Sequence, residues 1–95
     1  MATLVLTRAG FDDILQTLGR VPPQLWVNAG VLSELELANH RAAGYDITNF
    51  TAFVDLSSPS EVEHAIQVVR EHHPLQRIWV EYPPGSPNRS VAATP

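Results

Sequence analysis

Short apolar runs alternate with helix-like segments along this chain of 95 residues, and this alternation constrains the fold more than any other feature. The strand-like runs cover residues 3–7, 25–28, 45–50 and 77–81. Three segments with helical spacing of apolar residues lie between them. Strands that alternate with helices favour a mostly parallel sheet, because each parallel connection needs a long crossover and a helix supplies it. The order predicts a βαβαβαβ chain.

The helix between the second and third strands has the strongest local signature. Ser33 and Glu36 have the spacing of a capping box, in which each side chain bonds the backbone of the other residue. Leu32 and Leu37 have the spacing of a hydrophobic staple across the same turn. Gly44 supplies a stop signal. We therefore expect a helix that begins after Ser33 and ends before Gly44.

The other two helices are predicted from apolar spacing and from their ends. The first covers residues 11–18, and Asp12 and Asp13 are expected in its first turn, where the helix dipole favours negative charge. The third covers residues 58–73, with a serine as cap and a proline at its first helical position. It ends at a histidine that precedes a proline, because that residue avoids the α conformation.

The chain is predicted to form one small α/β domain over residues 1–82, followed by a flexible proline-rich tail over 83–95. The expected architecture is a mostly parallel, open sheet of four strands with three helices. A ferredoxin-like α+β fold is the alternative if residues 45–56 form two antiparallel strands.

The composition excludes several classes of function. The basic residues are six arginines against ten acidic residues, which gives a net charge of −4 and argues against nucleic-acid binding. The sequence contains no lysine, so Schiff-base chemistry and a phosphate-loop lysine are excluded. It contains no cysteine, so thiol nucleophiles and cysteine-ligated metals are excluded as well. No cofactor is expected.

Two further classes of site and location are disfavoured. The histidines, His40, His64, His72 and His73, lack the spacing of a helical metal site, and no metal is predicted. The first residues carry no basic leader, and no apolar run reaches the roughly 18 residues of a membrane span. We therefore expect a cytoplasmic protein without membrane contact.

A ligand site in such a fold would lie beyond the carboxyl ends of the strands. There, Arg8 is a candidate to hold an anion and Asn28 to orient a substrate. Gly30, Thr51 and Tyr82 complete the candidate binding residues. Polar residues also end strands simply because strands end at the surface, so a structural role is the competing interpretation.

Asp55 and Glu81 are candidates for an acid–base pair, provided that the third and fourth strands are neighbours. Paired carboxylates suit this chemistry because their surroundings can separate the two pKa values. The competing interpretation is that Asp55 supports the Ser57–Ser58 turn and that Glu81 is solvated.

The two tryptophans, Trp26 and Trp79, occupy similar positions in the second and fourth strands. Four strands have two faces, and three helices leave one face incompletely covered. We expect both indoles on that face, forming a homodimer or a contact with a protein partner. The alternative is that both are ordinary core residues beneath a helix.

The sequence therefore predicts a small bacterial-type interaction module that self-associates through the tryptophan-bearing face of its sheet. The alternative is an enzyme that binds a small molecule or phosphate ester at the carboxyl edge. Truncation of Trp26 or Trp79 would disable the module, whereas loss of Arg8 or Glu81 would disable the enzyme.

Overall fold

A computed structural model describes residues 1–81 of the chain. Tyr82 and the predicted tail over 83–95 lie outside the described residues. The elements, in chain order, are β1 (Ala2–Val5), α1 (Arg8–Leu18), β2 (Leu25–Val27), α2 (Glu34–Ala42), β3 (Ile47–Asn49), α3 (Pro59–His72) and β4 (Ile78–Glu81).

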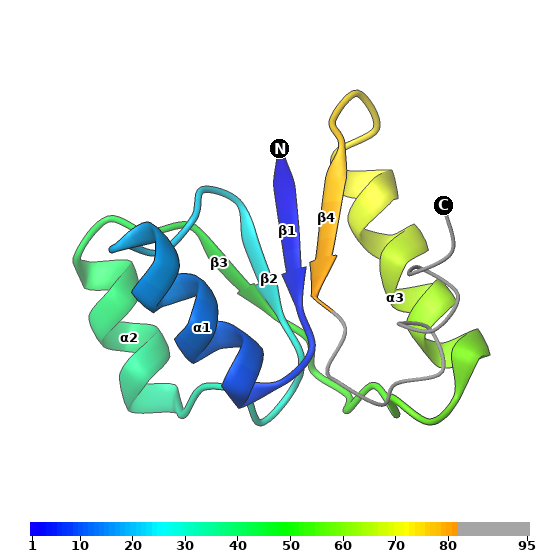
Figure 1. Ribbon diagram of the computed structural model, residues 1–95, viewed down its shortest axis with the longest axis horizontal. Helices are drawn as coiled ribbons and strands as arrows, with labels where there is room; N and C mark the ends of the chain where they lie inside the picture. Colours follow the sequence, from blue (N-terminus) through cyan, green and yellow to red (C-terminus); the bar gives the residue numbers. More distant parts are fainter. Residues whose placement is uncertain (82–95) are drawn as a thin grey trace.

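The four strands form one open, all-parallel sheet in the order β3-β2-β1-β4. Helices α1 and α2 lie on one face of this sheet and α3 lies on the other (Figure 1). The predicted α/β fold is confirmed. The ferredoxin-like alternative is wrong, because the segment from Thr51 to Ser58 adds no strand to the sheet and crosses to the start of α3.

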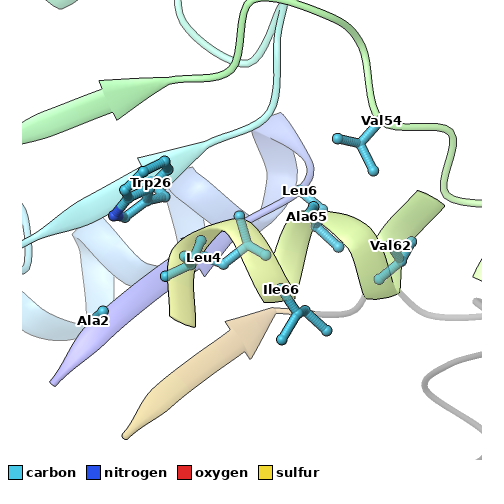
Figure 2. Packing of buried hydrophobic residues seen from close by; sticks show 9 residues of the cluster. Ala2, Leu4, Leu6, Trp26, Val54, Val62, Ala65 and Ile66 are labelled. Carbon is cyan, nitrogen blue, oxygen red and sulfur yellow. The ribbon is translucent and has the colours of Figure 1, made fainter. Parts of the chain in front are cut away.

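Each face of the sheet carries its own hydrophobic core. On the α3 face, Leu4 and Trp26 pack beneath Val62, Ile66 and other apolar residues of the helix (Figure 2). The core of the opposite face joins strand residues to α1 and α2; its buried members are Val5, Phe11, Val21, Leu25, Val27, Val31, Leu32, Leu37 and Ile47. The strands of the sheet's centre are therefore buried on both sides, as expected for parallel strands.

The helices begin where the sequence places capping residues, with one exception. Ser33 and Glu36 form the predicted capping box of α2, and Ser58 caps α3 as expected. The exception is α1, which begins earlier than predicted because Thr7 caps it by accepting a hydrogen bond from Gly10. Its first turn contains no acidic residue, so the expected placement of Asp12 and Asp13 there was wrong.

The helices leave one face of β4 exposed. Helix α1 packs on β1 and α2 on β3, whereas α3 packs on β1 and β4 of the opposite face. Strand β4 therefore has a helix on one side only, and its other side is the exposed part of the α1/α2 face. None of the helices in residues 1–81 is long and apolar enough to cross a membrane.

Candidate functional site

The two tryptophans lie on opposite faces of the sheet, which corrects the expectation that they share one. Trp26 pairs with Leu4 of β1, whereas Trp79 pairs with Thr3. Neighbouring residues of a strand point to opposite faces, so this offset of one residue reverses the side of the indole. Similar positions within two strands did not imply a shared face, because the register of each strand is set separately.

Trp26 is a core residue and is only 6% exposed. Its indole Nε1–H donates a hydrogen bond to Nε2 of His73 at 3.1 Å. The rings of Phe50 and His72 lie against it, with centroids at 5.6 Å and 5.1 Å. The indole is thus enclosed by its own chain, and the predicted interface role does not apply to Trp26.

Trp79 lies on the exposed face of β4 and is 44% exposed. It forms part of the floor of an open groove of about 410 Å³. Ile14 and Leu18 of α1 form one wall, and the exposed side chain of Met1 lies at the amino end of β1. The full lining consists of Met1, Thr3, Asp13, Ile14, Thr17, Leu18, Pro22, Pro23 and Trp79. We call this feature the Trp79 groove.

The Trp79 groove is suited to binding apolar surface. Among the described residues that line it, only Asp13 has a charged side chain, and Thr3 and Thr17 add two hydroxyl groups. Partly exposed Trp side chains next to apolar neighbours are typical of interaction surfaces, because a large ring leaves water while its N–H can still find a partner.

Glu81, a predicted base, is held at the start of α1. Its carboxylate accepts hydrogen bonds from the backbone N–H groups of Leu6 at 3.2 Å and Thr7 at 3.3 Å, and from the Thr7 hydroxyl at 3.2 Å. Gly10 lies so close that a Cβ there would overlap the Glu81 carboxyl group. The carboxylate therefore takes up the N–H donors between β1 and β4, where the strand order reverses and such sheets commonly bind ligands.

Arg8, the predicted anion holder, is bonded to two carboxylates of its own chain. Its guanidinium lies 3.1 Å from Asp12 and 2.8 Å from Glu36, and it donates to the Val31 carbonyl oxygen at 3.3 Å. The hydrogen bond to Glu36 raises the pKa of Arg8 above its ordinary value. A half-exposed ion pair of this kind leaves little positive charge free for a ligand.

Asn28, the predicted orienting residue, is fully buried and joins the ends of two segments. Its amide nitrogen donates to the carbonyl oxygens of Leu6 at 3.2 Å and Val54 at 3.0 Å. Its amide oxygen accepts from the Val54 N–H at 2.8 Å. Asn28 thus fixes the loop that follows β3, and its amide has no exposed surface.

The remaining predicted binding residues lie apart from one another. Gly30 is exposed, with φ at +85°, in the turn before α2. Thr51 is exposed and lines a second shallow hollow beside α3, together with Phe53 and His64. The structure does not bring them into one pocket with Arg8.

Asp55 and Glu81 do not follow neighbouring strands, so they do not form the predicted acid–base pair. That pairing required neighbouring third and fourth strands, but β3 and β4 are opposite edges of the sheet. Asp55 instead accepts hydrogen bonds from the hydroxyl and the backbone N–H of Ser57, at 2.7 Å and 2.9 Å. These bonds hold the pKa of Asp55 below its ordinary value and make it a turn residue, as the competing interpretation stated.

Sequence reasoning missed most of the Trp79 groove. Leu18 ends the apolar stripe of α1, and its spacing gave no sign that the stripe extends beyond the core. Met1 and the Pro22–Pro23 pair lie near Trp79 only because β4 pairs with β1. The signal that could have found them is that three helices are too few to cover both faces of four strands. The strand order is then needed to tell which strand is left exposed.

Among residues 1–81, no three histidine or carboxylate side chains gather closely enough to hold a metal ion. The exposed apolar groove at Trp79 is therefore the strongest candidate for a functional surface. Comparison with protein-family models, with curated proteins and with solved structures found no match to this chain.

Proposed function

We propose that this protein is an interaction module that self-associates through the Trp79 groove. The observation that carries the proposal is the exposure of Trp79, together with Met1 and Leu18, around the exposed face of β4. A contiguous apolar surface of this kind is a frequent site of protein association.

The energetic argument concerns the indole of Trp79. Tryptophan is enriched among the few residues that dominate the free energy of protein association, because burial of its large ring removes much apolar surface from water. Here 44% of the residue is available for such burial. Trp26 makes no such contribution, since its own chain already covers it.

An enzyme at the carboxyl edge has weaker support. Each of its candidate side chains within residues 1–81 that could bind charge or move a proton is bonded to its own chain: Arg8 to Glu36, Asp55 to Ser57, and Glu81 to Thr7. Catalysis by these groups would require them to leave those partners first. The Trp79 groove needs no such rearrangement.

The test is the effect of Trp79→Ala on the dissociation constant of the dimer, measured by sedimentation equilibrium. Truncation of a central aromatic contact costs about 2 kcal/mol or more, so the dissociation constant should rise at least about 30-fold. Leu75→Ala is the matched control. Leu75 is 98% exposed but lies outside the groove, so its truncation should leave the constant unchanged.

Two outcomes would contradict the proposal. One is a wild-type chain that is monomeric at every concentration. The other is an equal effect of the two substitutions, which would mean that exposed apolar area in general, and not the groove, drives association. Circular dichroism and thermal unfolding of each variant verify that the comparison is made between folded proteins.

A further inference from the structure

Strand β4 is an edge strand whose sequence is complementary to itself in the antiparallel direction. We propose that two copies of this chain pair through the outer edges of β4, antiparallel, about a two-fold axis at Trp79. This inference rests on the proposed function and specifies its geometry: a continuous sheet of eight strands. Trp79 of the second copy then lies beside Trp79 of the first on one face of the joined sheet, so that the two Trp79 grooves adjoin.

The backbone of β4 has the polarity that this pairing needs. The Ala2 N–H donates to the Arg77 carbonyl oxygen at 3.0 Å, so Arg77 turns its backbone toward β1. Alternate residues of a strand turn their N–H and C=O to opposite sides. Ile78 and Val80 therefore turn theirs outward, and within residues 1–81 no strand pairs with that edge (Figure 1).

An antiparallel second copy offers the same two residues in reverse order. With the axis at Trp79, Ile78 of one copy lies opposite Val80 of the other. Residues opposite each other with outward-facing backbones exchange both of their N–H···O bonds. The two symmetric Ile78–Val80 pairs would thus make four hydrogen bonds across the interface.

The side chains favour this register over one with its axis at Arg77. Trp79 lies opposite its own copy in the closely spaced kind of pair, where aromatic rings interact best. Arg77 lies opposite Glu81 of the second copy, so unlike charges meet at both ends of the pairing. An axis at Arg77 would instead place two like charges opposite each other and separate the two indoles.

The neighbouring groups are compatible with the ion pair. Glu81 accepts hydrogen bonds from Leu6 and from Thr7. A carboxylate has about four acceptor positions, so it can also receive a guanidinium. Arg77 is exposed and directly precedes β4, where it also borders a hollow beside α3 with Ile78 and Val80. Strand alternation continued to Arg77 would give its Cβ the face of Trp79 and Glu81.

The edge also lacks two of the devices that discourage strand pairing. Lysine and proline commonly protect exposed edges. Residues 77–81 contain neither, and the chain contains no lysine at all. The other edge strand, β3, has three residues and offers a shorter template. Pairing through β4 is therefore favoured over pairing through β3.

The test removes a backbone N–H from the outer edge of β4 without removing apolar surface from the Trp79 groove. Ile78→Pro deletes the N–H of two of the four proposed hydrogen bonds and should raise the dissociation constant of the dimer at least about 10-fold. Val80→Pro should do the same and covers the case in which one variant fails to fold. Asn49→Pro is the matched control. The backbone N–H of Asn49 points away from β2 at the outer edge of β3, so its loss should leave the dissociation constant of the dimer unchanged.

A distance measurement tests the geometry independently. The chain has no cysteine, so spin labels can be attached at single introduced sites. Labels at Gln76→Cys, which keeps the proposed Arg77–Glu81 ion pair, should report one short distance, because the two Cα atoms would lie about 21 Å apart. Labels at Asn49→Cys, across the extended sheet, should report about 30 Å or more, given strand spacings of about 4.8 Å.

The outcomes separate this inference from the proposed function. If Trp79→Ala weakens the dimer but both proline variants leave it intact, or if the Gln76 labels are far apart, edge pairing is overturned and the groove still mediates association. If the wild-type chain is monomeric, both proposals are overturned together. Weakening by both proline variants with the expected pair of distances supports the two-fold arrangement at Trp79.

Discussion

At the residue scale, Trp26 requires an acceptor at His73. An indole N–H can only donate, so Nε2 of His73 must carry the lone pair in the bond of 3.1 Å. His73→Leu leaves this buried donor without a partner and should lower the free energy of unfolding by about 1–2 kcal/mol. His73→Gln, which retains an acceptor, should lose less. Urea denaturation monitored by tryptophan fluorescence measures both, and equal losses would contradict the assigned bond.

Gly10 and Glu81 are predicted to be energetically coupled. Alanine is favoured over glycine inside a helix by about 1 kcal/mol, so Gly10→Ala would ordinarily stabilise α1. Here the new methyl group would displace the Glu81 carboxylate from Leu6 and Thr7. Gly10→Ala should therefore be neutral or destabilising in the wild-type chain and stabilising in a Glu81→Ala background. A double-mutant cycle by chemical denaturation gives the coupling, and additive effects would contradict it.

At the scale of elements, α2 should give the protein an acid-sensitive component of stability. The backbone N–H of Ser33 and the guanidinium of Arg8 hold the pKa of Glu36 below the ordinary value of 4.5. A carboxyl group whose pKa is lower in the folded state stabilises that state above the unfolded pKa. This contribution is lost as the pH falls through the folded pKa. Stability should thus decline as the pH falls below about 4.5.

The variant that checks this dependence is Glu36→Gln. It keeps a side chain that can bond Ser33 but removes the charge. Between pH 5 and the lowest pH at which the protein still folds, the urea midpoint of this variant should therefore change less than that of the wild type. Glu34→Gln removes a carboxylate from the same turn and leaves both bonds of Glu36 in place. The urea midpoint of Glu34→Gln should therefore depend on pH as that of the wild type does. The same pH dependence in all three chains would show that Glu36 is not the group responsible.

The elements themselves were predictable from local sequence because their signals are local. The capping box at Ser33 and Glu36 and the serine cap of α3 identified two helix starts. The start of α1 was missed because its cap is Thr7, whose hydroxyl is shared between Gly10 and the distant Glu81. No pattern within a short window reveals a partner 74 residues away.

At the scale of the whole molecule, the alternation of strands and helices was sufficient for the α/β fold but not for the strand order. The order β3-β2-β1-β4 decides that Asp55 and Glu81 follow strands at opposite edges. The register of each strand on β1 decides that Trp26 is buried and Trp79 exposed. Both depend on contacts between segments far apart in sequence, and such contacts leave no local periodicity.

Self-association through the Trp79 groove is the central claim, and the solution mass of the full chain tests it most directly. Sedimentation equilibrium of the wild type over a wide range of concentrations should show a mass that rises from that of one chain, 10.5 kDa, to twice that value. A reversible transition between these two masses is the predicted result. A constant mass of 10.5 kDa at all concentrations would contradict the account.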